Sequence, residues 1–286
     1  NGEYSLSFDG VNDYIDISGV SDDLDGDTTF SIFFSANPKT ASFPEGTSYV
    51  FSINGSSGGN VNILLLGLNR NGSLSIHGPN STEFTSTASI VDNNWYNIAY
   101  TRNGSLGTLY LDGVELGTHT VIYSLSSSDY WSIGQEFDGT SVTNEYVGHI
   151  DNVSVWDRAL SEQEIQNNAA GTLSGNEDGL RGYWIFNNGS DTIAYDHSGN
   201  ANHGNILGAT WSMYGCTDPY AGNYDSTATM DDGSCAGYPD NGGYSLQFDG
   251  TDDYVQTGLY LNNLPYTIKC TFKADANSGE QSIVDT

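Results

Sequence analysis

A short acidic stretch near the end of the sequence is the first candidate for chemistry. It reads GCTDPYAGNYDSTATMDDGSC, and it places five possible oxygen ligands within fifteen residues, namely Asp218, Asn223, Asp225, Asp231 and Asp232. Calcium takes six to eight oxygen ligands, so these side chains could hold an ion, although no Glu stands at the distance that an EF-hand requires. Asp218 before Pro219 is also typical of a helix cap. The stretch therefore predicts either a metal site or a knot held by a disulfide alone.

Two cysteines frame this acidic stretch. Cys216 and Cys235 enclose a loop of roughly 20 residues, and closing such a loop contributes about 3 kcal/mol in the chain-entropy model. Disulfides persist in oxidising compartments, so the pair predicts an extracellular setting. The third cysteine, Cys270, lies in the alternating run YTIKCTFKA, which predicts a buried free thiol.

Aromatic side chains offer a second kind of site, because their rings stack on the faces of pyranose sugars while nearby Asn and Asp side chains accept hydroxyl hydrogens. The candidates for ligand binding lie close together in the sequence and are Tyr130, Trp131, Phe137 and Tyr146. A surface platform and a place in the core both remain open for them.

Catalytic patterns are weak. Retaining glycosidases need two carboxyl groups on one face, as an E-x-D-x-x-E strand would supply, and the run Glu136-Phe137-Asp138 begins this pattern, but Ser141 stands where the second Glu should be. The five histidines, at positions 77, 119, 149, 197 and 203, show no paired metal-ligand spacing. We interpret them as surface or turn residues, and we expect a protein that is not an enzyme.

Composition narrows the class of protein further. The chain of 286 residues carries 36 acidic against 7 basic side chains, for a formal net charge of -29. This charge repels nucleic acid and anionic membranes. No run approaches the ~20 apolar residues that span a bilayer, so we expect no membrane insertion. The abundance of Gly, Tyr, Ser, Thr and Asn favours strands and turns, which predicts an all-β protein.

The local patterns agree with this class. Alternating apolar runs flank Asn71-Gly72 and Asn103-Gly104, and such pairs are typical of tight β-hairpins. Many short strands at close spacing predict an antiparallel sandwich or barrel. One short helix is expected in ALSEQEIQNNA, where Ser161 and Glu164 form a capping box.

The opening of the sequence returns near its end. Residues 1–17 read NGEYSLSFDGVNDYIDI and residues 241–257 read NGGYSLQFDGTDDYVQT, an offset of 240 residues. We therefore predict a sandwich over residues 1–213, a small disulfide module over 214–236, a linker over 237–243 and the first strands of a second sandwich over 244–286. The chain is expected to be a piece of a longer tandem-repeat protein.

The motifs, taken in order, resemble a known family. SLSFDGVNDYIDI, WYNIAYTRNG, LYLDG, SIG, GHIDNVSVWDRALSEQEI and GLRGYWIFNNG are similar to the concanavalin A-like, laminin G-type jelly rolls of bacterial secreted proteins. This resemblance implies an antiparallel jelly-roll sandwich, a fold that hosts lectins, adhesins, spacers and enzymes. The cysteine module resembles the pattern GCTDPxAxNYxxxAxxDDGSC of large surface proteins of marine bacteria, which implies export to the cell surface.

The resemblance also implies a metal site. In jelly rolls of this kind a calcium ion often ties the first strands to a late one, and the matching residues here are Asp9, Asn12 and Asp13 in FDGVNDY with Asp151 in GHIDNV. The alternative is that Asp9-Gly10 is only a turn and Asp13 a surface residue. The equivalent residues of the second copy are Asp249, Asp252 and Asp253.

Two functions from different classes follow. The first is a non-enzymatic, calcium-stabilised repeat unit of a large extracellular adhesin or surface fibre, whose partners are further repeats of the same chain or identical subunits. The second is a lectin-like module that binds surface glycans and is attached to a secreted hydrolase. Both place the protein outside the cell or on its surface.

Overall fold

A computed structural model describes residues 3–55, 61–79, 81–138, 141–171, 173–237 and residue 255. Its contacts divide the chain into two units, residues 1–239 and 240–286. The predictions for the second copy, including Asp249, Asp252, Asp253 and Cys270, lie outside the described residues.

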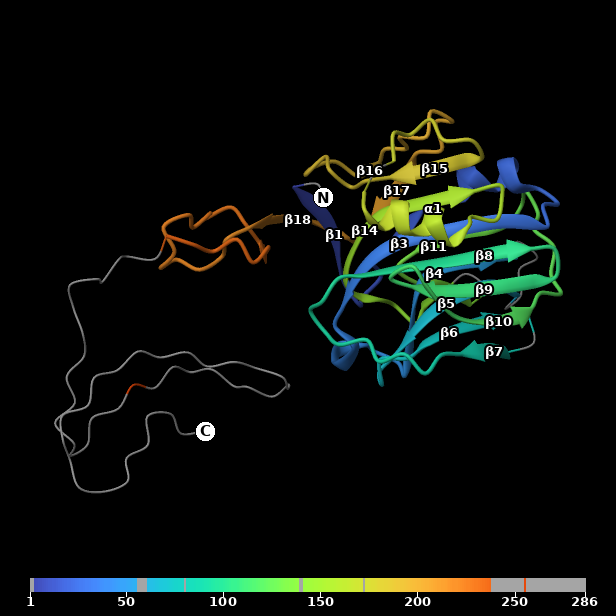
Figure 1. Cartoon of the computed structure of the whole chain (residues 1–286), viewed down its shortest axis with the longest axis horizontal. Coiled ribbons are helices and arrows are strands. Elements are labelled where there is room, and N and C mark those ends of the chain that lie inside the picture. The colour runs from blue at the N-terminus through green and yellow to red at the C-terminus, as the bar shows by residue number, and fades with distance from the viewer. Residues whose placement is uncertain are drawn as a thin grey trace, which may run out of the picture. The chain divides into compact units, whose positions relative to one another are not determined.

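The first unit is a sandwich of two large sheets (Figure 1). The first sheet has nine strands, in the order β10 (Val114–Thr120), β9 (Leu106–Leu111), β8 (Tyr96–Asn103), β3 (Thr29–Pro38), β14 (Val147–Trp156), β1 (Tyr4–Asp9), β18 (Thr210–Gly215) and β19 (Met230–Asp231), with β15 (Leu180–Trp184) also beside β14. All of its pairs are antiparallel except that of β18 with β19.

The second sheet has eight antiparallel strands, in the order β16 (Ile193–Ala194), β17 (Gly204–Leu207), β2 (Tyr14–Asp16), β11 (Tyr130–Ile133), β4 (Thr47–Asn54), β5 (Asn62–Asn69), β6 (Leu74–Gly78) and β7 (Ser81–Thr85). A separate hairpin pairs β12 (Glu136–Asp138) with β13 (Ser141–Thr143). In the part of the chain that the structure describes, the helical elements are α1 (Glu162–Ala169) and two 3₁₀ turns, Ser18–Leu24 and Thr40–Ser42. The predicted all-β, antiparallel sandwich is confirmed.

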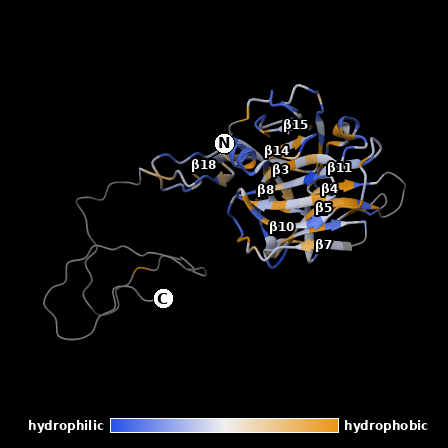
Figure 2. Cartoon of the chain, turned by 45° about the vertical axis from the view of Figure 1, so that its right-hand side comes forward, coloured by the Kyte–Doolittle hydropathy of each residue, from blue (hydrophilic) through white to orange (hydrophobic). Residues whose placement is uncertain are grey.

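Alternation along the strands separates the core from the outer faces. On β3, Ile32 and Phe34 enter the core between the sheets, while Phe33 between them joins a second apolar cluster on the outside. Successive side chains of a strand point to opposite faces, so this pattern fixes the strand's orientation. Figure 2 shows the apolar residues concentrated on the strands and the polar ones in the connecting loops.

The predicted turns and helix are present. Asn71-Gly72 connects β5 to β6. Gly72 has a φ of +81°, and a Cβ atom at this position would lie only 2.4 Å from the Ile90 carbonyl oxygen. Glycine is therefore required there. Asn103-Gly104 connects β8 to β9. The Ser161 side chain accepts the Glu164 backbone amide and the Glu164 carboxylate accepts the Ser161 amide, which forms the predicted capping box of α1.

Helix α1 lies on the outer face of the nine-stranded sheet, in front of β14 and β3 in Figure 1. Its Ile165 packs with Phe33 and Trp156 in the outer apolar cluster. This outer face is therefore partly covered, and it is separate from the core between the two sheets.

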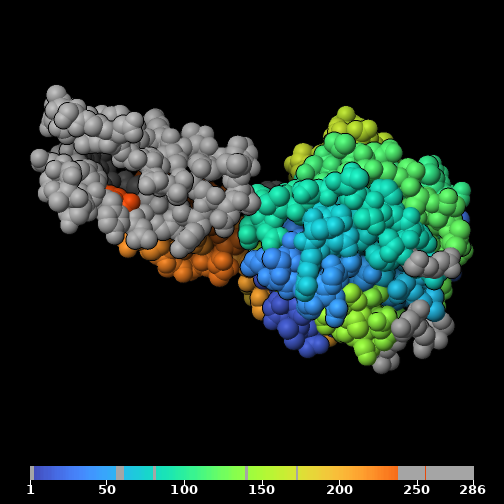
Figure 3. Space-filling model, turned by 90° about the horizontal axis from the view of Figure 1, so that it is seen from below, coloured from blue at the N-terminus to red at the C-terminus, as the bar shows by residue number. Residues whose placement is uncertain are grey.

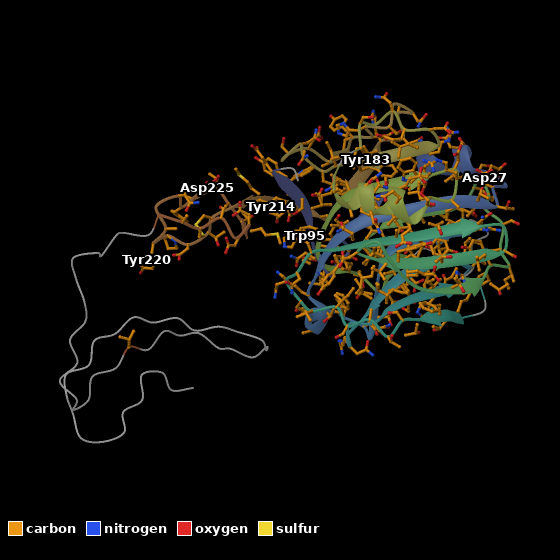
Figure 4. The ribbon with its side chains drawn as sticks, in the orientation of Figure 1. Asp27, Trp95, Tyr183, Tyr214, Tyr220 and Asp225 are labelled. Atoms are coloured by element: carbon orange, nitrogen blue, oxygen red, sulfur yellow. A yellow bond between two sulfur atoms is a disulfide. The ribbon has the colours of Figure 1, made fainter. Side chains whose placement is uncertain are left out.

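The cysteine module continues directly from the sandwich. Strand β18 pairs with β1 through Met213 and with β19 from Tyr214 onward, so one strand belongs to both parts. The space-filling view shows the dark-blue start of the chain beside the orange residues of β18 (Figure 3). Tyr214 also meets Trp95 edge-on, with ring centroids 6.0 Å apart (Figure 4). The predicted disulfide between Cys216 and Cys235 is formed.

Among the described residues, no helix is long and apolar enough to cross a membrane. Two of the five histidines contradict the surface interpretation. His119 is buried, with its Nδ1 2.8 Å from Glu83 Oε2, and His149 is buried on β14. Burial lowers the pKa of His149 to about 4, and the charge of Lys39 contributes in the same direction.

Candidate functional site

A cluster of aromatic rings lies on the outer face of the eight-stranded sheet. On β2 and β11, Tyr14 and Tyr130 point outward because their neighbours Ile15 and Trp131 point into the core. Phe137 on β12 packs against both outward rings, with its centroid 5.5 Å from Tyr14 in an edge-to-face arrangement and 6.1 Å from Tyr130. Tyr130 is 51% exposed, so the cluster presents ring surface to solvent.

Side chains of β4 hold the hairpin that carries Phe137. The Asn54 amide donates to the Phe137 carbonyl and accepts the Phe137 backbone amide, both at 3.4 Å. The Ser52 hydroxyl donates to the carbonyl of Gln135. Because the backbone of Phe137 is fixed at both its donor and its acceptor, its ring is held in place beside the two tyrosines.

A hydrogen-bond acceptor flanks these rings. Asp16 lies two residues after Tyr14 on the same face of β2, and burial, followed by the charge of Asp16, raises the pKa of the Tyr14 hydroxyl. Asn54, directly opposite Tyr130 in the β11–β4 register, is buried, and its amide is already bonded to Asn62 and Phe137. Ring surface with an acceptor such as Asp16 at its edge is an arrangement that stacks on a sugar and accepts its hydroxyl hydrogens.

Two carboxylates occupy the other side of β12. Glu136 and Asp138 share one side of the strand, opposite Phe137. Burial, together with the charge of Asp138, raises the pKa of Glu136 to about 7. Glu136 is only 5% exposed, and its Oε2 has no hydrogen-bond partner among the described residues. A buried, unpaired carboxylate next to a second carboxylate is an arrangement that a cation would stabilise.

The prediction of ligand binding is wrong for two of the four aromatic residues. Trp131 is 1% exposed and meets Phe30 and Phe51, and Tyr146 is fully buried between Phe8 and Phe43. Both belong to the core, since neither ring has a surface on which a sugar could stack. The other two, Tyr130 and Phe137, are in the cluster.

The predicted calcium loop is only partly assembled. Asp9, Asn12 and Asp13 form one tight turn, in which the Asp9 amide donates to Asp13 Oδ2 and the Val11 amide donates to Asp9 Oδ1, each at 2.7 Å. Burial, with a smaller contribution from the Asp9 charge, raises the pKa of Asp13. Gly208 closes over the turn, because a Cβ there would lie 2.1 Å from Asp13 Oδ1. The turn is thus held by its own backbone amides.

Asp151 is not part of this turn, which corrects the predicted set of ligands. The β1–β14 register pairs Asp9 with Val147 and Leu6 with Ile150. Asp151 therefore lies four residues beyond the partner of Asp9, or about 13 Å along the strand. Among the described residues, no group of three His, Cys, Asp or Glu side chains is arranged to hold a metal ion.

The acidic residues of the disulfide module serve as turn caps. Each predicted ligand accepts a backbone amide: Asp218 from Tyr220, Asn223 from Ala236, Asp225 from Thr227, Asp231 from Gly233 and Asp232 from Ser234. Hydrogen bonds from the Thr227 hydroxyl and amide lower the pKa of Asp225. The disulfide of this stretch is formed, and a metal ion held by its acidic residues stays a prediction.

Comparison with known proteins identifies the superfamily to which the fold belongs. A sequence profile described as the Concanavalin A-like lectin/glucanases superfamily matches residues 9–166, more than half of the chain. The chain belongs to this superfamily. No curated protein matches the lectin/glucanase chain by sequence.

Several solved structures are similar to the chain. A protein from Bacteroides ovatus described as carbohydrate-binding superposes with a TM-score of 0.57 and 17% identity, over 74% of this chain and 60% of its own. A heptameric SAP-like pentraxin from Limulus polyphemus gives 0.47 and 19%, over 58% and 82% of the two chains. The NanB sialidase from Streptococcus pneumoniae gives 0.49 and 19%, over 58% and 27%. At 17% identity the likeness to the Bacteroides ovatus protein concerns the fold alone.

Two features of the site escaped the sequence reasoning. Tyr14 was not a candidate, although it alternates with the core residue Ile15 and could have been placed on an outer face. Glu136 and Asp138 were considered only as the remnant of a glycosidase motif. Glu136 and Asp138 are two residues apart on one strand, and this spacing predicts that both carboxylates lie on the same side of it.

Proposed function

We propose that this lectin/glucanase-superfamily chain is a glycan-binding module that works without catalysis. The observation that carries the proposal is the ring cluster of Tyr14, Tyr130 and Phe137 on the outer face of the eight-stranded sheet. The Asp16 carboxylate, on the same face of β2 as Tyr14, supplies an acceptor beside the rings. The carbohydrate-binding description of the Bacteroides ovatus protein supports the same function.

The non-catalytic part of the proposal rests on the carboxylates near the rings. Retaining and inverting glycosidases need two carboxyl groups that flank the bond to be cleaved. Glu136 and Asp138 instead share one side of a three-residue strand, away from the exposed rings, and Glu136 is buried. Hydrolysis of a bound glycan that Glu136→Gln abolishes would contradict this part.

Removing a ring from the cluster should weaken glycan binding. We expect the full chain to bind at least one sugar class on a glycan array, and Phe137→Ala to weaken that binding at least about tenfold, because contact aromatics at binding hot spots contribute more than ~1.4 kcal/mol. Tyr130→Ala should act in the same direction. Calorimetry with the best array ligand measures both changes.

The matched control is Tyr220→Ala in the disulfide module, because Tyr220 is 78% exposed and distant in sequence from the cluster. It should bind as the wild type does. Equal loss in all three variants would show binding that is not specific to the cluster. A blank array together with end-to-end assembly of the purified chain would favour the other hypothesis, a structural repeat of an adhesin or fibre.

We also propose that calcium binds at Glu136 and Asp138 rather than at the Asp9–Asp13 turn. The buried Oε2 of Glu136 lacks a hydrogen-bond partner among the described residues, and Asp138 lies on the same side of β12. Calcium takes carboxylate, amide and water oxygens, so the donor set is suitable. An ion there would relieve the repulsion between the two carboxylates and stiffen the hairpin that positions Phe137.

Calcium should therefore raise the thermal midpoint of the chain. At a concentration 100-fold above Kd, an ion that binds only the folded state stabilises it by about 2.7 kcal/mol. Asp138→Asn should remove most of this shift, and differential scanning calorimetry with calcium or chelator measures it. Because the pKa of Glu136 is raised to about 7, the shift should shrink below that pH as the carboxyl takes up a proton.

Asp225→Asn removes a carboxylate from the disulfide module and serves as the control. This variant should keep the calcium-dependent rise in thermal midpoint. Asp9→Asn tests the loop predicted from the sequence. Loss of the response in Asp9→Asn with retention in Asp138→Asn would move the ion back to the Asp9–Asp13 turn.

Secretion and the repeat architecture complete the proposal. The Cys216–Cys235 disulfide suits an oxidising compartment, and the repeated opening motif at residues 241–257 supports an array of such modules. In such an array several weak glycan sites would act together, because linked sites gain avidity. The partners are then surface glycans and further repeats of the same chain.

A further inference from the structure

The two large sheets end side by side at one edge of the sandwich. Strand β7 is the last strand of the eight-stranded sheet and β10 is the last of the nine-stranded sheet, and the two strands lie next to each other (Figure 1). Gly117 on β10 permits this approach, because a Cβ atom there would lie 2.6 Å from the Phe84 ring on β7. Among the described residues no backbone ladder joins β7 to β10, so side chains must hold this edge closed.

A buried histidine and a glutamate meet across this edge. The side chains of His119 on β10 and Glu83 on β7 are only 3% and 12% exposed, and Nδ1 of His119 lies 2.8 Å from Oε2 of Glu83. Each side chain lies over a glycine. A Cβ atom at Gly107 would overlap the His119 ring, and one at Gly78 would overlap the Glu83 carboxylate. Glycine at both positions therefore leaves the space that this contact occupies.

The other imidazole nitrogen is also engaged. Nε2 of His119 lies 3.1 Å from the hydroxyl of Tyr100, which in turn lies 3.1 Å from the hydroxyl of Tyr123. Burial raises the pKa of both phenols above the ordinary value of 10, so both keep their protons. With a neutral imidazole, Tyr100 can donate to Nε2 and accept from Tyr123. A proton on Nε2 would turn this acceptor into a donor and reverse the chain of hydroxyl bonds.

The charges that face His119 come from two neighbouring strands. Glu83 on β7 supplies a carboxylate, and the buried Arg102 on β8 supplies a guanidinium, which lies 4.9 Å from the centroid of the Tyr123 ring. The two phenols add no charge. Burial lowers the pKa of His119, although the charge of Glu83 acts in the opposite direction. At neutral pH the imidazole is therefore uncharged, and acid adds a charge that the buried site disfavours.

We propose that His119 and Glu83 form a clasp that holds the two sheet edges together at neutral pH and releases β7 from β10 when acid protonates the imidazole. Opening exposes His119 to water, where an imidazole titrates near pH 6.5. In the closed clasp the imidazole takes up its proton only at lower pH, so the open form gains population as the pH falls below about 6.5. None of these residues belongs to the ring cluster around Phe137, so the clasp does not depend on the function proposed for that cluster.

Hydrogen–deuterium exchange of the full chain at pH 7.5 and 5.5 tests the clasp in peptides that cover β7 and β10. Between these pH values, protonation of one exposed imidazole favours the open form by at most about tenfold. We expect acid to lower the protection of these peptides several-fold more in the wild type than in His119→Gln, whose amide does not titrate. Comparing the two proteins at each pH cancels the intrinsic exchange rate and the titration of all other groups.

The matched control is His197→Gln, which removes an exposed histidine and should behave as the wild type does. Glu83→Gln is a second variant, which keeps the test valid if His119→Gln does not fold. It removes the carboxylate that favours the imidazolium, so acid should lower the protection of β7 and β10 more than in the wild type, toward the tenfold limit. Equal pH dependence in the wild type and His119→Gln would overturn the clasp. An acid effect in Glu83→Gln that is no larger than in the wild type would overturn it too.

Discussion

Replacing Trp131 with Ala should lower the free energy of unfolding by about 3–5 kcal/mol, the cost of removing a large buried aromatic side chain. The ring is 1% exposed and meets Phe30 and Phe51 at centroid distances of 6.4 and 6.0 Å. Its removal would leave a cavity between the two sheets. Urea denaturation of the chain, with and without a bound glycan, measures the change.

The neighbouring residue supplies the control. Tyr130→Ala removes a ring that is 51% exposed, so it should weaken glycan binding with little loss of stability. The two variants therefore separate the roles of adjacent residues on one strand. Loss of binding in Trp131→Ala at unchanged stability would contradict the assignment of this ring to the core.

The contrast between Tyr130 and Trp131 shows what the sequence could predict. The run YWSIG identified a strand correctly, and strand alternation means that two neighbours cannot both face solvent. Which one points outward depends on the register with β4 and β2, and that register is set by pairing between residues distant in the sequence. Local patterns such as Asn71-Gly72 and the Ser161 capping box need no such information, and both were predicted correctly.

The distance between Asp9 and Asp151 also depends on the strand register. The order β3, β14, β1 does bring an early strand beside a late one, as the resemblance implied. However, the register places Asp151 opposite the beginning of β1 and Asp9 at its end. Strand adjacency follows from the fold class, but the position along the strand depends on packing that single motifs do not encode.

Asp151→Asn should make the stability of the chain less dependent on pH. Asp151 is buried on β14, and although its Oδ1 accepts the Asn152 amide at 2.8 Å, burial raises its pKa to about 7 from an ordinary value of 3.8. Between these pH values the folded state holds a proton that the unfolded state releases. Stability therefore falls as the pH rises through this window, by on the order of 4 kcal/mol in total, and it stays lowered above pH 7.

The variant has no charge to bury at any pH, and the carbonyl oxygen of its Asn side chain can still accept the Asn152 amide. We expect wild type and variant to have similar stability at pH 4 and the variant to be more stable at pH 8. Denaturant unfolding at several pH values measures the difference in the free energy of unfolding between variant and wild type. All other carboxyls are common to both proteins, so their titration cancels in this difference. If this stability difference did not change with pH, the prediction would be wrong. A positive charge, such as a bound cation, would then have to balance the Asp151 carboxylate in the folded chain.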